Sequence, residues 1–351
     1  MKSVFLESHN IKNRASGLGT FNYELIKGLS QLDLSNFKIT LNSSVTKVLQ
    51  DEFGSKFNYH EYNSLQRYSL FRINKKNDVW HSLNQNTKVE PFSNPKKYIL
   101  TVHDVNFVEE NSKEINNKSN KLFIEKLNRA DCITYISNFA KEQTHKYFEV
   151  PKVPEYIIYN GNPIQDISNQ DLIKPNFTSN RVFFFSIGDF IERKNFHSLV
   201  EMMRIMPNYD LIISGNNEKP YGIKIQKMIE KYQLKNVFLT GKISDNDKHF
   251  YLKNCTAFLF PSIREGFGLP PIEAMAYGKP VFISNKTSLP EIGGDAAFYW
   301  KNFDPEYMKS TLITNLELFI SEGNDAIENV KKRANFFDWK KAASEYLTLY
   351  K

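Results

Sequence analysis

The chain has 351 residues, of which 41% are hydrophobic and 24% charged. This composition is that of a folded globular protein, and the length predicts two domains that each bury a core. The net charge of +7 favours an anionic ligand, an anionic membrane surface or nucleic acid. We expect no nucleic-acid partner, because the sequence has no long lysine-arginine block, zinc-ligand spacing or RNA-recognition motif. It also has no run of about eighteen apolar residues, so we expect no membrane-spanning helix.

The N-terminal segment begins with a strand-like run at residues 3–8, followed by an amphipathic stretch at residues 20–32 that predicts a helix. A single lysine followed directly by a strand is unlike a secretory signal, so we expect a cytoplasmic protein. Gly17 and Gly19 lie between the two runs, in a predicted strand-to-helix turn. This turn is not a dinucleotide-binding fingerprint, because Asn22 occupies the third glycine position.

The rest of the first half alternates β-rich runs with amphipathic stretches, which predicts a parallel sheet covered by helices. His103 closes one of these strands, a position where a lone histidine is more often structural than functional. The basic, aromatic-rich stretch from Lys113 to Arg129 is a candidate contact with a membrane surface or a lipid-linked acceptor, although a solvated helix face is the favoured interpretation. Cys132 and Cys255 each open an apolar run, and we expect buried free thiols.

Residues 163–336 repeat the same alternation, with nearly continuous apolar strands of the kind buried on both faces. The preceding segment is rich in Asn, Pro, Gly and Ser, which indicates turns and a surface linker. We therefore place the first domain at residues 1–162 and the second at residues 163–336. Residues 337–351 predict a closing helix with Trp339, Ala343, Tyr346 and Leu347 on one face.

The first strand of the second domain is followed by Gly188 and then by two adjacent cations, Arg193 and Lys194. Ligands of open α/β sheets bind at the carboxyl ends of strands, where this pair would stabilise a diphosphate and the charge that grows on it. The alternative is a solvated pair that precedes a helix capped by Asn195.

Glu265 and Glu273 lie on either side of a glycine-rich turn that opens a helix at Pro270 and Pro271. We expect the first-turn amides and the helix dipole to favour a phosphate there, with Glu273 in the first helical turn. The glycines of the turn would let backbone approach the ligand. A second acidic pair, at residues 245 and 247, is interpreted as a helix N-cap and a first-turn acid, and not as a metal site.

Seven residues separate Glu265 from Glu273 within EGFGLPPIEAMAYGKPV, and this segment resembles the signature of the retaining family four glycosyltransferases. Residues 186–203 resemble that family's glycine turn and Arg-Lys-Asn donor loop. The resemblance extends over nearly the whole chain, because it also includes the residues around His103, the segment that starts at Gly17, and the segments SNFAKEQ and IIYNGNP. One departure is Asp189, because many relatives have arginine directly after the glycine.

The resemblance implies the α/β GT-B fold, with two Rossmann-like domains whose parallel sheets face each other across a cleft. The first domain would bind the acceptor and the second the donor, and the helix of residues 337–351 would cross back onto the first. The implied reaction is metal-independent transfer of a hexose, with retention, from a nucleotide diphosphate sugar to a hydroxyl. Similarity to bacterial polysaccharide mannosyltransferases favours GDP-mannose over a UDP-hexose, and a glycan or lipid-linked oligosaccharide as acceptor. We also expect a peripheral contact with an anionic membrane, and we expect no cofactor.

The resemblance also assigns roles to residues. Glu273 would bind the ribose hydroxyls, Glu265 would lie close to the transferred sugar, and Arg193 and Lys194 would stabilise the diphosphate. His103 would face the donor sugar. The backbone of the turn and three further glycines would line the donor: Gly266, Phe267, Gly268 and Leu269, with Gly17, Gly19 and Gly188. Two rival functions are a nucleotide-sugar epimerase of the same fold and a non-catalytic sugar-nucleotide binding subunit.

Overall fold

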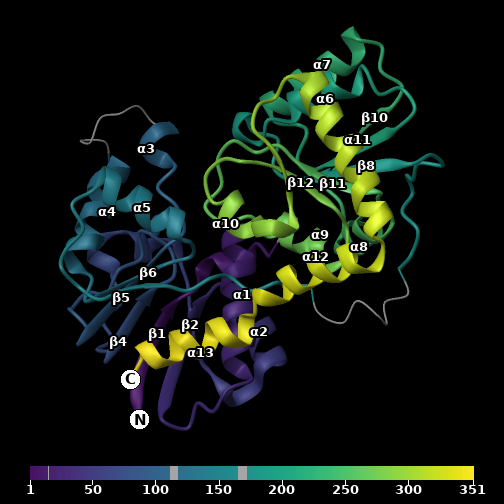
Figure 1. Cartoon of the computed structure of the whole chain (residues 1–351). Coiled ribbons are helices and arrows are strands. Elements are labelled where there is room, and N and C mark those ends of the chain that lie inside the picture. Colours follow the sequence, from purple (N-terminus) through teal and green to yellow (C-terminus); the bar gives the residue numbers. More distant parts are fainter. Residues whose placement is uncertain (15, 111–117, 165–171) are drawn as a thin grey trace. The chain divides into compact units, whose positions relative to one another are not determined.

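A computed structural model describes residues 1–14, 16–110, 118–164 and 172–351 (Figure 1). The chain divides into two compact units. Unit 1 comprises residues 1–163 together with residues 338–351, and unit 2 comprises residues 164–337. Each unit contains one parallel sheet with helices on it.

Unit 1 is built on a seven-stranded parallel sheet with the order β3-β2-β1-β4-β5-β6-β7. Because the chain moves one way from β1 to β3 and the other way from β4 to β7, right-handed crossovers place the two sets of helices on opposite faces. The strands are β1 Lys2–Glu7, β2 Phe37–Ser43, β3 Asn58–Glu61, β4 Val79–Ser82, β5 Lys97–Val102, β6 Cys132–Tyr135 and β7 Glu155–Ile157. The helices are α1 Gly17–Ser30, α2 Thr46–Phe53, α3 Phe107–Glu110, α4 Lys118–Arg129, α5 Asn138–Tyr147 and α13 Trp339–Leu349.

The sequence predicted that the segment before the domain boundary is a surface linker, but part of it is a strand. Residues 155–157 form β7, which pairs with β6 through Ile133, Thr134 and Tyr135. Turn-forming residues on both sides of this short run hide it, and its own burial is incomplete because it is an edge strand.

The last helix, α13, packs on α1 (Figure 1). Gly28 of α1 makes this approach close, because a Cβ there would lie 2.8 Å from the Trp339 carbonyl oxygen and 2.8 Å from the Ala343 Cβ. Trp339, Ala343 and Tyr346 are buried as predicted, but Leu347 is only half-buried, and Leu349 takes its place on the buried face. The reason is the helical repeat, which returns to one face after three and then four residues.

The basic stretch at residues 113–129 lies partly outside the described residues, which resume at Lys118. In the described part, neither membrane contact nor a solvated helix face holds for Lys126. The Lys126 side chain is 2% exposed and bonds to the Glu90 carboxylate and, at 3.2 Å, to Ser82 Oγ. Arg129 binds the other oxygen of Glu90 at 2.9 Å. The buried carboxylate of the β4–β5 connection therefore draws Lys126 into the interior, while Arg129 keeps 22% of its side chain exposed.

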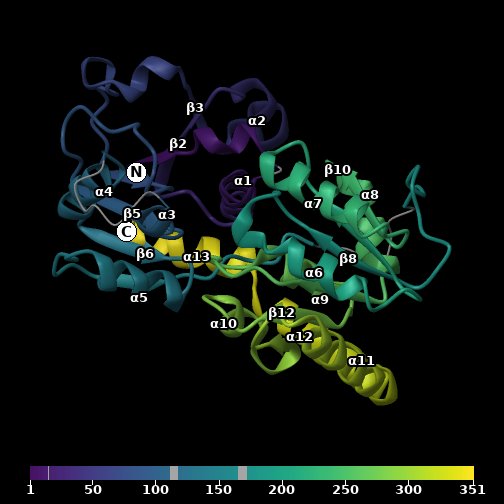
Figure 2. The same ribbon diagram turned by 90° about the horizontal axis from the view of Figure 1, so that it is seen from above.

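Unit 2 is built on a six-stranded parallel sheet with the order β10-β9-β8-β11-β12-β13, the doubly wound order of a Rossmann fold. Strands β8, β10 and β12 of this sheet are labelled in Figure 2. Phe, Leu, Ile and Met side chains form a core on one face of the sheet, to which the strands contribute alternate residues such as Phe184, Leu211 and Leu259. The strands are β8 Phe183–Ile187, β9 Asp210–Ser214, β10 Val237–Gly241, β11 Ala257–Phe260, β12 Val281–Ser284 and β13 Phe298–Trp300. The helices are α6 Phe196–Met203, α7 Pro220–Lys231, α8 Asp245–Asn254, α9 Leu269–Ala276, α10 Leu289–Gly293, α11 Pro305–Glu322 and α12 Asn324–Phe336.

The two cysteines are buried free thiols, which confirms the prediction. Burial raises the pKa of Cys132 to about 11 and that of Cys255 to about 12, so both remain protonated and unreactive at neutral pH. Within the described part of the chain, the helices are all too short or too polar to span a bilayer.

Acid should destabilise the fold through two buried histidines of unit 1. Burial lowers the pKa of His81 to about 3 and that of His103 to about 4, below the 6.5 of an unfolded chain. Between those values the unfolded chain binds protons that the folded one does not, so the free energy of unfolding falls as pH drops below 6.5. Urea unfolding at pH 7 and pH 5 should differ by about 2 kcal/mol for each histidine. His81→Gln should remove close to half of this pH dependence, and equal stability of the wild-type protein at the two pH values would contradict the prediction.

Candidate functional site

The loop after β8 carries Arg193 and Lys194 in a short 3-10 turn at Glu192–Lys194. The turn ends at Asn195, which has a left-handed backbone with φ of 57°. The sequence predicted that the Asn195 side chain caps α6, but it does not. Its Nδ2 donates to the Pro261 carbonyl oxygen at 3.2 Å and so connects the loop to the end of β11. Gly188 leaves room beside the turn, since a Cβ there would lie 3.3 Å from Lys194 Cε.

Glu265 binds both cations of this loop. Lys194 Nζ lies 2.6 Å from Glu265 Oε1, and an Arg193 guanidinium nitrogen lies 3.3 Å from Oε2. Ser262 Oγ donates to Oε1 at 2.6 Å, and the ammonium group of Lys194 lies 4.6 Å from the centre of the Phe260 ring. Lys194 is 8% exposed and Glu265 is 9% exposed. The pair is therefore a buried charge cluster, and the interpretation as solvated cations before a helix is wrong for Lys194.

The cluster keeps its carboxylate ionised. Burial by itself would raise the pKa of Glu265, but the charges of Lys194 and Arg193, with hydrogen bonds from Lys194 and Ser262, outweigh burial and lower it. Burial lowers the pKa of Lys194, and Arg193 acts in the same direction, while Glu265 opposes both. Charge interactions are strong in a water-poor place, so Lys194 and Arg193 keep Glu265 ionised and would act strongly on a phosphate bound beside them.

Hydrogen bonds from several elements hold the Glu265 loop. The Arg193 carbonyl oxygen accepts from the Ile263 amide at 2.8 Å. The Glu265 amide donates to Thr287 Oγ1 at 3.0 Å, and Ser288 Oγ donates to the carbonyl oxygens of Glu265 and Phe267 at 3.0 and 2.6 Å. Gly268 has φ of 130°, and a Cβ there would lie 3.0 Å from a Leu289 methyl, so glycine is required. Because these bonds fix the turn, its backbone is held in one conformation before any ligand arrives.

Helix α9 starts at Leu269, with Pro270 and Pro271 in its first turn, as predicted. The prolines have no amide hydrogen, so among the N-cap and the first three residues of the helix only Gly268 and Leu269 have an amide that can donate. Glu273 is the fifth residue of α9 and therefore lies in its second turn, not in the first. The end of this helix thus presents fewer donors than the sequence analysis expected.

Glu273 is buried and pairs with a residue that the sequence analysis missed. Lys248 Nζ, from α8, lies 3.0 Å from Glu273 Oε1. Burial by itself would lower the pKa of Lys248, but the charge of Glu273 and the hydrogen bond to it outweigh burial and raise that pKa. The only sequence signal for Lys248 is its position three residues after Asp245, which it also approaches at 3.8 Å.

The sequence analysis interpreted Asp245 as the N-cap of a helix, but α8 begins one residue earlier than that interpretation requires. Ser244 is the N-cap, and its side chain and that of Asp247 form a reciprocal capping box. Asp245 is therefore a first-turn acid and not the N-cap, while Asp247 is the third residue of the helix.

His103 belongs to unit 1 and directly follows β5. It is buried: its amide donates to Gln85 Oε1 at 3.0 Å, and its Nε2 lies 2.8 Å from the Leu83 carbonyl oxygen. A carbonyl only accepts, so Nε2 carries the hydrogen and Nδ1 is the lone-pair nitrogen of the neutral ring. The Phe21 ring packs edge-on against the imidazole, with centroids 4.6 Å apart. The histidine is therefore held in a fixed orientation and tautomer.

Gly17 and Gly19 lie in the first turn of α1, not in a loop before it. Ser16 is the N-cap and its Oγ accepts from the Gly19 amide at 3.1 Å. A Cβ at position 19 would lie 1.8 Å from the Asn13 carbonyl oxygen, whereas a Cβ at position 17 would meet open space. Gly19 is thus needed for the close approach of α1 to the preceding turn, a structural reason that is sufficient by itself.

Unit 2 therefore brings together most of the candidate residues. Arg193 and Lys194 follow β8, and Glu265 follows β11, the two neighbouring strands between which the strand order reverses. In open α/β sheets this switch point, outside the carboxyl ends of the strands, is where ligands bind. The remaining candidates, His103, Gly17 and Gly19, belong to unit 1.

Comparison with known proteins assigns the class. Residues 168–333 match the family model described as Glycosyl transferases group 1. Over 222 residues the chain is 28% identical to the O-antigen chain mannosyltransferase RfbU of Salmonella typhimurium, covering 62% of this chain and 60% of that protein. It is also 24% identical over 270 residues to the O-antigen chain mannosyltransferase B of Escherichia coli, covering 73% and 70%. The match to the serotype-specific mannosyltransferase WbdA of Escherichia coli, 30% over 191 residues, spans 48% of this chain but only 23% of that protein.

Solved structures share the fold over the full length. Sucrose-phosphate synthase from Thermosynechococcus elongatus aligns with a TM-score of 0.73 at 17% identity, covering 100% of this chain and 98% of that one. Anabaena Alr3699/HepE in complex with UDP-glucose also aligns with a TM-score of 0.73, at 16% identity over 99% and 100% of the chains. These alignments and the two parallel sheets confirm the α/β GT-B fold. Residues 168–333, which include Glu265 and Glu273, match the group 1 glycosyltransferases, as the resemblance around these two residues predicted.

Proposed function

We propose that the protein transfers a hexose, with retention of anomeric configuration, from a nucleoside diphosphate sugar to a hydroxyl of a glycan or lipid-linked acceptor. The observation that carries this proposal is the buried cluster of Lys194, Arg193 and Glu265 at the switch point of unit 2. A diphosphate gains negative charge as the sugar leaves, and fixed cations in a water-poor site stabilise that charge without reorganising. Metal-independent catalysis rests on these cations.

In the proposed reaction, the bond between the anomeric carbon and the diphosphate oxygen breaks, and a bond from that carbon to the acceptor oxygen forms on the same face. The acceptor proton passes to the departing phosphate oxygen. Lys194 and Arg193 bind the diphosphate, and Glu265 binds hydroxyls of the transferred sugar. Because Glu265 already binds both cations, the anionic donor would enter a site whose positive charge is held by a neighbouring carboxylate and not by solvent.

The backbone at Gly266, Phe267, Gly268 and Leu269 would lie against the donor, and Glu273 would accept hydrogen bonds from the ribose hydroxyls. His103 would contribute to the same donor from unit 1, with its neutral ring facing the sugar, and Gly17 and Gly19 would lie near the phosphates. Gly188 would leave the space for Lys194. These roles come from the resemblance; the fixed tautomer of His103 and the constrained Gly268 turn support two of them.

GDP-mannose is the favoured donor, because three relatives are named mannosyltransferases. A UDP-hexose is second, supported by the solved complex of a structural neighbour with UDP-glucose. Names of relatives that include O-antigen chains support a bacterial surface glycan as the acceptor class. A cytoplasmic location with peripheral membrane contact would suit such an acceptor.

Acceptor-dependent release of a nucleoside diphosphate tests this proposal. The protein should release GDP from GDP-mannose only when a mannose-containing oligosaccharide is present, and the product should keep the anomeric configuration of the donor, measured by proton NMR. Interconversion of sugar nucleotides without acceptor would instead indicate an epimerase. Nucleotide binding without any reaction would indicate a binding subunit.

Thermal stabilisation by free nucleotides tests which nucleobase the donor carries. At a concentration a hundred times its dissociation constant, a ligand adds about 2.7 kcal/mol to the free energy of unfolding. We expect GDP to raise the melting temperature more than UDP or dTDP does at the same concentration. A larger shift with UDP would replace GDP-mannose with a UDP-hexose and leave the rest of the proposal in place.

A further inference from the structure

Unit 1 carries an exposed segment that is both apolar and basic, at residues 65–76. Between Tyr62 and Asn77 the sequence has no acidic residue, whereas it has four cations: Arg67, Arg72, Lys75 and Lys76. Large apolar side chains alternate with them and are open to solvent: Leu65 is 50% exposed, Tyr68 64%, Leu70 88% and Phe71 53%. Single exposed apolar residues are ordinary, but four within seven positions form a group that calls for a partner.

Hydrogen bonds and two buried residues, Gln66 and Ile73, fix this segment. Asn63 caps the first of two short 3-10 turns by accepting from the Leu65 amide at 3.0 Å. Gln66 is buried and donates to the Glu61 carbonyl oxygen at 2.9 Å. Ile73 is also buried, and its carbonyl oxygen accepts from the Phe92 amide at 3.0 Å. The exposed positions therefore belong to an ordered part of the fold and do not result from a loose chain.

Phe92 extends the group. Its backbone bond to Ile73 places it beside the segment, and its side chain is 61% exposed. We call residues 65–76 together with Phe92 the 65–76 surface. It thus joins five exposed apolar side chains to four cations that no acidic residue of the same segment neutralises.

We propose that the 65–76 surface docks on an anionic phospholipid bilayer. Apolar and aromatic side chains would enter the region between head groups and acyl chains, while the cations stay at the head-group phosphates. Charge complementarity decides between occupants: a second copy of this chain would bring four more cations to the same place, whereas anionic lipid neutralises them. The 65–76 surface consists of residues of unit 1, whereas Lys194, Arg193 and Glu265 belong to unit 2.

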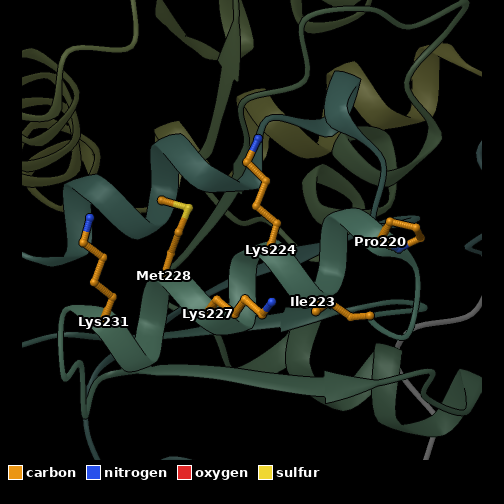
Figure 3. Close-up of a pocket in the computed structure, with 6 residues that line it drawn as sticks. All are labelled: Pro220, Ile223, Lys224, Lys227, Met228 and Lys231. Atoms are coloured by element: carbon orange, nitrogen blue, oxygen red, sulfur yellow. The ribbon is translucent and has the colours of Figure 1, made fainter.

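Helix α7 carries a second basic face, which differs from the 65–76 surface because it exposes fewer apolar side chains. A pocket along that helix is lined by Pro220, Ile223, Lys224, Lys227, Met228 and Lys231 (Figure 3). Lys224 there pairs with Glu192 at 3.1 Å, and Ile223 is the large apolar side chain that this face exposes, at 49%. The α7 face offers charge with little to insert, so it serves as a matched control for electrostatic attraction alone.

Vesicle co-sedimentation of the full chain tests the proposal. Binding to vesicles of phosphatidylcholine with phosphatidylglycerol should exceed binding to phosphatidylcholine alone. Because each cation near an anionic surface contributes about a five-fold factor, Lys75→Gln with Lys76→Gln should lower the partition coefficient about 25-fold. The same charge change on α7, Lys227→Gln with Lys231→Gln, should lower it by less than about three-fold, because the α7 face has little apolar surface to insert between head groups.

The apolar part is tested separately. Leu70→Ser with Phe71→Ser should weaken binding to anionic vesicles while nucleotide binding and circular dichroism stay unchanged. Trp at position 71, introduced as Phe71→Trp, should show a blue-shifted emission when anionic vesicles are added. Equal binding to neutral and anionic vesicles, or equal losses from the two lysine pairs, would overturn the proposal. So would a change from dimer to monomer on Leu70→Ser with Phe71→Ser, because it would identify a second copy as the occupant.

Discussion

Lys194→Met should lower turnover by a factor of about 10² to 10³, because it removes a fixed donor aimed at charge that develops during the reaction. Methionine keeps the bulk of the side chain beside Phe260 but takes away the ammonium group that lies 2.6 Å from Glu265. The fold should survive, since Arg193 and Ser262 remain bound to that carboxylate. Nucleoside diphosphate release at saturating donor and acceptor measures the effect.

Two further variants separate catalysis from stability in this experiment. Lys227→Met removes an exposed lysine of the same unit and should leave turnover unchanged. Lys194→Met combined with Glu265→Gln removes both members of the buried pair, so it should be more stable than Lys194→Met alone yet remain inactive. A Lys194→Met enzyme that turns over at the wild-type rate would remove Lys194 from the site.

Local chemistry made part of the candidate site predictable. Pro270 and Pro271 fit only the start of a helix, so they fixed where α9 begins, and the glycine before them has the backbone angle that excludes other residues. The position of Arg193 and Lys194 after a buried strand was equally visible in the sequence. What the sequence did not contain was the contact between Lys194 and Glu265, which are 71 residues apart and meet because β8 lies beside β11.

Residues that need a distant partner were missed for the same reason. Lys126 has the spacing of a surface residue on an amphipathic helix, but Glu90 of another segment draws it into the interior. Lys248 gave no signal of its contact with Glu273, because α8 and α9 are separate elements whose packing is tertiary. Short-range rules also misplaced Gly17 and Gly19, since glycine usually indicates a turn and here lies in a helix that Ser16 caps.

Glu273→Gln should weaken nucleotide binding about ten- to a hundred-fold while turnover at saturating donor falls much less. The carboxylate is proposed to accept hydrogen bonds from the ribose hydroxyls, and such bonds to a charged group contribute roughly 1.5 to 3 kcal/mol. The ribose lies away from the reacting carbon, so its binding is the same in the ground and transition states and appears mainly in KM. Titration calorimetry with the nucleoside diphosphate measures the change directly.

Lys248 decides whether Glu273 acts as a ligand group or only as half of an ion pair. If the carboxylate binds ribose, Lys248 is a positioning residue: Lys248→Met should weaken nucleotide binding by less than Glu273→Gln, and Lys248→Arg should restore most of it, because a cation again lies near Oε1. If the pair is only structural, both single variants should lower the melting temperature and leave the dissociation constant of the nucleotide unchanged. The buried position of Glu273 on the helix that the Glu265 turn opens favours the first outcome, since a cation on one side of a fixed carboxylate leaves its other lone pairs for a diol.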